Sequence, residues 1–146
     1  MDPSVEELLA AQRALRSRFD DFRQALRRRD KAAYEMAIQD FQGQLDRWTN
    51  TEERVLLPAL GRVPLPGRDS QRELRLEYVQ IRELTRYLLR QISEGARMGD
   101  ILGITDNLER RLSAHESEMQ TVYYPAVAAV LTREERRILE EAAPKD

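Results

Sequence analysis

The sequence predicts an all-α protein, an antiparallel up-down-up-down four-helix bundle with a short C-terminal helix. Apolar residues recur every three or four positions through most of the chain, which is the period of an α-helix. Only six glycines and six prolines occur in 146 residues, too few turn-forming residues for an all-β protein. Hydrophobic residues make up 41% of the chain, which is enough to bury a core. We therefore expect residues 1–146 to form a single helical domain.

The first half of the chain predicts one helical hairpin. A first apolar stripe runs through residues 5–26, and the charged run at residues 27–30 is expected to turn the chain. A second stripe runs through residues 34–56. Pro58 is expected to end or kink this second helix, because proline lacks an amide hydrogen and clashes with the preceding turn.

The second half predicts another hairpin and the last helix. Residues 61–69 hold two prolines and two glycines and form the clearest break in the chain. Ser70 and Glu73 have the spacing of a capping box at the start of the third helix, which residues 95–99 are expected to close. The fourth stripe runs through residues 101–130 and contains Pro125. A second capping-box spacing at Thr132 precedes a short helix that ends near Glu141.

Composition excludes several classes of protein. The formal net charge of −2 gives no general attraction to nucleic acid or to an anionic membrane. The chain has no cysteine, which excludes disulfides, thiolate metal sites and a cysteine nucleophile. No apolar run approaches the roughly 20 residues of a membrane span, and the acidic start of the chain is unlike a signal peptide. We therefore expect a cytoplasmic protein. Its basic residues are nearly all arginine, which favours a bacterial source.

Four polar residues interrupt the apolar stripes, one on each long helix: Gln12, Glu52, Tyr78 and His115. A polar group buried without a partner costs roughly 1–3 kcal/mol, so such residues are expected to meet one another. One interpretation is a hydrogen-bonded cluster that fixes the register of the helices. The other is a metal or ligand site between facing helices, where bundles commonly build such sites. Either way, we expect Glu52 to contact His115 or Tyr78 directly.

Four segments of the chain resemble the helix signatures of hemerythrin-like (HHE) domains. FQGQLDRWTNTEERVLLPAL, residues 41–60, is similar to the second-helix signature, in which a histidine is followed four residues later by a glutamate and then by Leu-Pro. LLAAQRALRSRF, LRLEYVQIREL and LSAHESEMQTVYYPA are similar to the first, third and fourth signatures. The resemblance implies a four-helix bundle, and in that family the bundle holds a non-haem di-iron centre that binds or senses dioxygen and related small species.

The resemblance also implies that most of the metal ligands have been replaced. Three positions where the family has histidine carry other residues here, namely Gln12, Trp48 and Tyr78. Met119 stands where the family often has a carboxylate. Only Glu52 and His115 keep the character of ligands, too few donors for two iron ions. Trp48 and Met119 are instead suited to filling the volume of a metal-free core.

We therefore expect a metal-free binding, signalling or structural module with no cofactor. The alternative is one iron, zinc or manganese ion, or a small ligand of the dioxygen or nitric oxide type, held by Glu52, Tyr78 and His115. Glu77, Glu116 and Glu118 lie beside the stripes and are expected to face solvent or neighbouring helices.

Enzyme and nucleic-acid functions are not expected. The chain has no glycine-rich phosphate loop, no nucleophile elbow and no second histidine. A Glu52–His115 couple could transfer protons, but no substrate pocket is evident from the sequence. Arginine runs at residues 27–29, 110–111 and 136–137 are flanked by acidic residues, as on solvated helix faces.

The partner is expected to be an unidentified protein or small ligand, and a homodimer is possible. Tyr123-Tyr124 and the loop from Val63 to Pro66 are the candidates for a partner surface, because aromatic residues are common at interfaces. The tyrosine pair is equally compatible with a cap on the end of the bundle.

Overall fold

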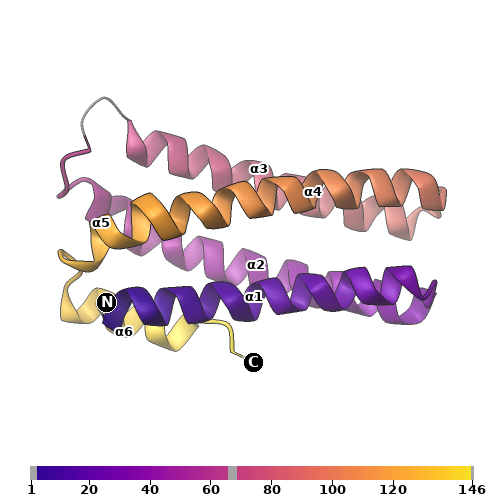
Figure 1. Ribbon diagram of the computed structural model, residues 1–146, viewed down its shortest axis with the longest axis horizontal. Helices are drawn as coiled ribbons and strands as arrows, with labels where there is room; N and C mark the ends of the chain where they lie inside the picture. The colour runs from indigo at the N-terminus through magenta and orange to yellow at the C-terminus, as the bar shows by residue number, and fades with distance from the viewer. Residues whose placement is uncertain (1–2, 66–68, 146) are drawn as a thin grey trace.

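The computed structural model describes residues 3–65 and 69–145 and confirms the all-α prediction. The long helices contact one another in chain order and run antiparallel (Figure 1). They are α1 (Pro3–Arg27), α2 (Lys31–Leu60), α3 (Ser70–Ser93) and α4 (Met98–Glu118). A π-helical turn η1 (Met119–Tyr123), a short helix α5 (Tyr124–Ala128) and the C-terminal helix α6 (Arg133–Ala142) follow.

The core runs along the length of the bundle between the apolar stripes. Three phenylalanines illustrate the packing: the ring centroid of Phe19 lies 6.0 Å from that of Phe22 and 5.1 Å from that of Phe41. All three side chains are buried. Close-packed aromatic and aliphatic side chains of this kind supply most of the stabilisation of a bundle, because short-range helix propensity alone is marginal.

The turn between α1 and α2 lies at the predicted residues. Arg29 adopts a left-handed backbone conformation with φ 56°. Asp30 then caps α2, because its carboxylate accepts a hydrogen bond from the amide of Ala33 at 3.2 Å. At its other end α2 passes through Pro58 and ends at Leu60, so the proline precedes the helix end by two residues rather than forming it.

The start of α3 corrects the predicted cap by one residue. Asp69, not Ser70, is the N-cap, and its side chain accepts a hydrogen bond from the amide of Arg72 at 3.3 Å. Ser70 is the first helical residue and is buried. A carboxylate is a strong acceptor at the positive end of a helix, which explains why aspartate takes this position. Pro66, part of the predicted loop surface, and Gly67 lie outside the described residues.

The sequence pattern predicted one helix over residues 101–130. The structure instead divides this segment into α4, η1 and α5. Pro125 has no amide hydrogen, and its ring crowds the carbonyl four residues before it. The chain responds with the π-helical turn η1, in which the amide of Tyr124 donates to the carbonyl of Met119, five residues back. The wider turn shifts the register of the residues that follow. Tyr123 and Tyr124 are buried, so of the two interpretations of this pair the exposed partner surface is wrong.

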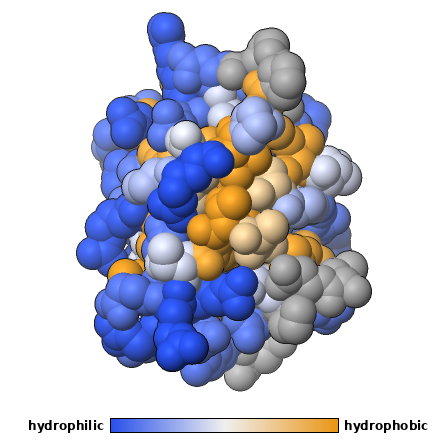
Figure 2. Space-filling model, turned by 90° about the vertical axis from the view of Figure 1, so that its left-hand side faces the viewer, coloured by the Kyte–Doolittle hydropathy of each residue, from blue (hydrophilic) through white to orange (hydrophobic). Residues whose placement is uncertain are grey.

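Helix α6 begins with the predicted capping box, which is confirmed: the Thr132 side chain accepts from the amide of Glu135, and the Glu135 side chain accepts from the amide of Thr132. The helix packs against α2 and the start of α1 (Figure 1). Figure 2 shows the adjoining end of the bundle, where apolar residues gather at the centre of a largely hydrophilic face. Among the described helices, none is long and apolar enough to cross a membrane.

Two leucine substitutions separate the contribution of the core from that of the surface. Leu56 on α2 is fully buried, whereas Leu76 on α3 is 54% exposed. Leu56→Ala should lower the free energy of unfolding by about 2–5 kcal/mol, because it removes buried surface and leaves a cavity. Leu76→Ala should change it by less than about 0.5 kcal/mol. Urea unfolding followed by circular dichroism measures both, and equal losses would contradict the packing described here.

Candidate functional site

The six residues singled out by the resemblance all lie in or beside the core of the bundle. Five of them are buried, namely Gln12, Trp48, Glu52, Tyr78 and Met119. His115 is nearly so, with 11% of its side chain exposed. The four long helices and η1 therefore bring these residues into the interior. The four polar ones were expected to meet one another, but in the described part of the chain their side-chain hydrogen bonds go to other residues.

Glu52 is hydrogen-bonded to Tyr124, not to His115 or Tyr78. The Tyr124 hydroxyl donates to Glu52 Oε2 at 2.9 Å, and both side chains are buried. Within the described residues, this is the side-chain hydrogen bond that Glu52 makes. No hydrogen bond joins Glu52 to His115 or Tyr78 among the described residues, although Glu52 and His115 line the same cavity. Tyr124 takes that place because the π-helical turn before Pro125 rotates it into the core.

Burial makes Glu52 an unusual carboxyl group. Removal from water raises its pKa to about 7, while the nearby charge of His115 and the hydrogen bond from Tyr124 act in the opposite direction. Burial and the proximity of Glu52 also raise the pKa of Tyr124 well above its ordinary value, so the phenol stays protonated and remains a donor. Glu52 can thus change its charge close to neutral pH inside the core.

His115 has a different carboxylate partner. Its Nδ1 lies 2.7 Å from Oε1 of Glu77, a residue that we had expected to face solvent or a neighbouring helix. Glu77 is on the outer side of α3 and remains 30% exposed. The His115 ring also meets the edge of the Tyr78 ring, with centroids 5.5 Å apart and planes inclined by 66°. In the sequence, the one sign of the His115–Glu77 pair is that Glu77 directly precedes Tyr78, one of the polar residues on the apolar stripes.

Gln12 belongs to a separate hydrogen-bonded group between α1 and the end of α4. Its carbonyl oxygen accepts from Nε2 of Gln120 at 2.7 Å, and its own Nε2 donates to the backbone carbonyl of Glu116 at 3.3 Å. The carboxylate of Glu116 pairs in turn with Arg16, which also pairs with Glu109. These contacts hold α1 against α4. They also satisfy the buried side-chain amide of Gln12, so this amide needs no ligand.

A cavity of about 30 Å³ lies beside this polar core. Gln12, Trp48, Glu52, His115 and Tyr124 contribute to its walls, together with aliphatic side chains and Phe41. One water needs about 10–15 Å³ of such space, so the cavity has room for one or two waters or a molecule of similar size. On the outer side of His115 lies an open hollow lined by Glu77 and Arg111 among others. His115 therefore forms part of the wall between the cavity and the surface.

The Tyr78 hydroxyl is one of two buried side-chain atoms among the described residues that lack a hydrogen-bond partner, the other being Oδ1 of Asp46. It is buried and has no hydrogen-bond partner among the described residues. Burial and the surrounding acidic groups, Glu52 first among them, raise its pKa well above the ordinary value, so the group is a neutral phenol. A buried hydroxyl without a hydrogen-bond partner lowers the stability of the folded state, so the hydrogen-bonding capacity of Tyr78 is not satisfied.

The donor set does not fit a di-iron centre. Two metal ions in a bundle core need several carboxylate and imidazole ligands. In the part of the chain that the structure describes, no three histidine, aspartate or glutamate side chains come together in a way that could hold a metal ion. Glu52 already accepts from Tyr124, and the bulky Trp48 and Met119 side chains are buried in the same interior.

Comparisons of the chain with family models, with curated protein sequences and with solved structures find no match.

The charge change of Glu52 predicts a specific pH dependence of stability. With a folded-state pKa near 7 and an unfolded value near 4.5, the folded state holds the proton more tightly. Its stabilising effect is complete below about pH 4.5, declines as the pH rises to about 7, and is then constant. Glu52→Gln cannot ionise. Its free energy of unfolding relative to wild type should therefore rise by about 3 kcal/mol across this range.

Chemical unfolding at a series of pH values measures this difference. The control is Glu83→Gln, which neutralises an exposed carboxylate on α3 and should show no such rise. A difference between Glu52→Gln and wild type that stays flat with pH would show that Glu52 is not buried as described.

The two core tyrosines should respond differently to loss of their hydroxyl groups. Tyr124→Phe removes the donor to Glu52 and should cost about 1–3 kcal/mol, because it leaves a buried acceptor unpaired. Tyr78→Phe removes a hydroxyl that has no partner among the described residues and should be neutral or stabilising by up to about 1 kcal/mol. Urea unfolding of both variants measures the contrast. An equal loss for Tyr78→Phe would indicate that its hydroxyl binds something in solution.

Proposed function

We propose that this chain is a divergent hemerythrin-like bundle in which a hydrogen-bonded polar core replaces the di-iron centre. It acts as a metal-free binding, signalling or structural module rather than as an enzyme. Its partner is a protein or a small ligand. The family assignment rests on the helix signatures of the sequence, and the functional assignment rests on how the remaining polar residues are used.

The observation that carries the proposal is the hydrogen bond between Tyr124 and Glu52. The one carboxylate that keeps a ligand position in the core accepts from a protein donor at 2.9 Å. A carboxyl group must lose its proton to bind a metal, whereas burial raises the pKa of Glu52 and favours the neutral acid. Trp48 and Met119 are packed into the same interior and leave a cavity of only about 30 Å³. These features favour a core that is satisfied without a metal.

The second candidate is a single-metal or small-ligand site, which one arrangement favours. The Nδ1 atom of His115 contacts Glu77, and His115 also lines the core cavity. In metal sites a histidine commonly pairs one ring nitrogen with a carboxylate and presents the other to the metal. Glu52 lines the same cavity, and the Tyr78 ring meets the His115 ring, with a hydroxyl that has no hydrogen-bond partner among the described residues. Iron, zinc or manganese would then be held by Glu52, Tyr78 and His115.

Metal analysis of the purified full chain decides between the two candidates. The protein is expressed in cells supplied with iron, zinc and manganese. Its metal content is measured by elemental mass spectrometry, and its absorption spectrum is recorded. We expect no stoichiometric metal and no absorption beyond that of the aromatic residues. One tightly held ion per chain, lost in both Glu52→Gln and His115→Gln, would establish the second candidate. Arg62→Gln, in the turn that follows α2, changes a residue that pairs with Glu135 and does not line the cavity, and it serves as the control for non-specific loss.

A further inference from the structure

The outer face of α3 carries arginine and apolar side chains side by side. The helix packs against α2 on one flank and against α4 on the other, which leaves its outer face open (Figure 1). Residues three or four positions apart lie on the same face of a helix. Along about five turns of α3 such positions form one band of exposed or half-buried residues. We call this band the outer α3 stripe, and its members are Arg72, Arg75, Leu76, Val79, Glu83, Arg86, Tyr87 and Arg90.

We propose that the outer α3 stripe is a docking surface for an acidic amphipathic helix of a partner protein. The inference deepens the proposed function, because it names the kind of partner that the binding module takes and the surface that takes it. It rests on that function in this respect alone and makes no use of the polar core.

The apolar residues of the stripe are the first line of support. The described part of the chain exposes three large apolar side chains, namely Met36, Leu76 and Tyr87. Leu76 and Tyr87 are 11 residues apart, close to three full helical turns, so both project from the same face of α3. The half-buried Val79 lies between them. Apolar and aromatic side chains that are gathered on one exposed face are typical of surfaces that a protein partner covers.

The charge of the stripe defines the chemistry of the partner. Four arginines and one glutamate give it a net charge of +3, although the whole chain carries −2. Among the described residues, Arg75 and Arg90 form no ion pair, and the guanidinium of Arg90 lies 5.7 Å from the centre of the Tyr87 ring. Arg86 pairs only loosely with Asp46, at 3.5 Å. Carboxylates of a partner would therefore meet positive charge that the chain itself leaves uncompensated.

A hollow beside the stripe gives room for an anchoring side chain. It lies between α3 and α4, is open to solvent and has a volume of about 510 Å³. Leu84 and Tyr87 supply an apolar part of its lining, and Arg90 and Arg111 supply positive charge. Glu83 is the one acidic residue of the lining. A large apolar side chain with carboxylates on either side of it matches this combination.

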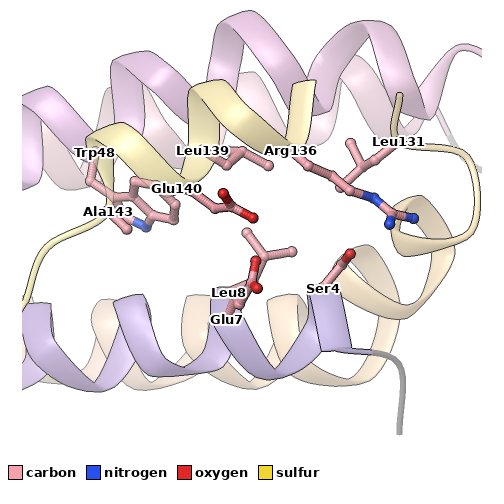
Figure 3. A pocket seen from close by; sticks show the side chains of 9 residues that line it. All are labelled: Ser4, Glu7, Leu8, Trp48, Leu131, Arg136, Leu139, Glu140 and Ala143. Atoms are coloured by element: carbon pink, nitrogen blue, oxygen red, sulfur yellow. The ribbon is translucent and has the colours of Figure 1, made fainter. Parts of the chain in front are cut away.

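The pocket between α1 and α6 does not offer the same combination. Figure 3 shows the carboxylates of Glu7 and Glu140 in it, and Leu139 of α6 packs against its wall. Its volume of about 20 Å³ has room for a water molecule but not for a side chain. Two carboxylates there would also repel an acidic segment. The docking surface is therefore assigned to α3.

A helix is the partner element that matches the shape of the stripe. The stripe is straight and about 27 Å long, and an amphipathic helix presents its apolar side chains along such a line. Nucleic acid is disfavoured, because apolar residues occupy the middle of the stripe and Glu83 lies among its arginines. A second copy of the chain is also disfavoured. Across a twofold axis the stripe would face itself and bring arginines together.

Binding of two designed helical peptides to the full chain tests the proposal. Both peptides carry leucine along one face, and their polar faces carry glutamate in one peptide and lysine in the other. Fluorescence anisotropy of the labelled peptides gives the dissociation constants. The glutamate peptide should bind, and its binding should weaken as salt is added. The lysine peptide should bind at least about tenfold more weakly.

Matched variants locate the site. Arg90→Glu should weaken binding of the glutamate peptide by about tenfold, whereas Arg110→Glu makes the same change on an exposed residue of α4 outside the stripe and should have no effect. Leu76→Ser should weaken binding by about threefold to tenfold, and Met36→Ser on α2 is its control. Glu83→Gln removes the one negative charge of the stripe and should strengthen binding. All five side chains are exposed, so circular dichroism should show that every variant folds.

Several results would overturn the proposal. They are binding of neither peptide, equal binding of both, wild-type binding by Arg90→Glu and Leu76→Ser, and tighter binding of a DNA oligonucleotide at the same residues. A dimer in analytical ultracentrifugation that Leu76→Ser abolishes would assign the stripe to a second copy instead. The metal analysis is independent of these results. A metal-free chain that binds neither peptide would keep its polar core and lose this surface, and a metal-bound chain that binds the glutamate peptide would do the reverse.

Discussion

The structure depends on how a carboxyl group is accommodated inside a helical core. Glu52 is 1% exposed and lies among aromatic and aliphatic side chains. A fully ionised carboxylate would be very costly in such a place without a cation beside it. The chain resolves this conflict with one hydrogen bond from Tyr124 and with a pKa raised to about 7. Trp48 packs beside this pair, and all three side chains line the same small cavity.

The π-helical turn is what makes the arrangement possible. In a regular α-helix, residues 119–128 would continue the face of α4, and Tyr124 would stand elsewhere on the helix. Pro125 disfavours that continuation, and the wider turn over Met119–Tyr123 changes the direction in which Tyr124 projects. A local steric rule at one proline thus supplies the donor that the buried carboxyl group needs on a different helix.

The sequence predicted the architecture better than it predicted the contacts. Periodic apolar residues fixed the number and order of the long helices, and the capping box at Thr132 fixed the start of α6, because both signals are local. The partners of Glu52 and His115 were not predictable in the same way. They depend on the phase of η1 and on the relative rotation of α3 and α4, which are set by tertiary packing. Tyr124 was therefore not recognised as the partner of Glu52, and Glu77 was not recognised as the partner of His115.

The hydrogen-bond partner of His115 determines whether the buried carboxyl group of Glu52 has a cation next to it. If its ring had turned toward Glu52, the two would form a buried ion pair, and the attraction would favour an ionised carboxylate at all but acidic pH. Instead His115 pairs with Glu77, which is partly exposed and can be charged at little cost. The charge of His115 still acts on Glu52 from a distance, but it does not overcome the effect of burial. The pairing at the surface of the bundle therefore leaves Glu52 without a cation of its own, and this is why the carboxyl group can exist in both charge states near neutral pH.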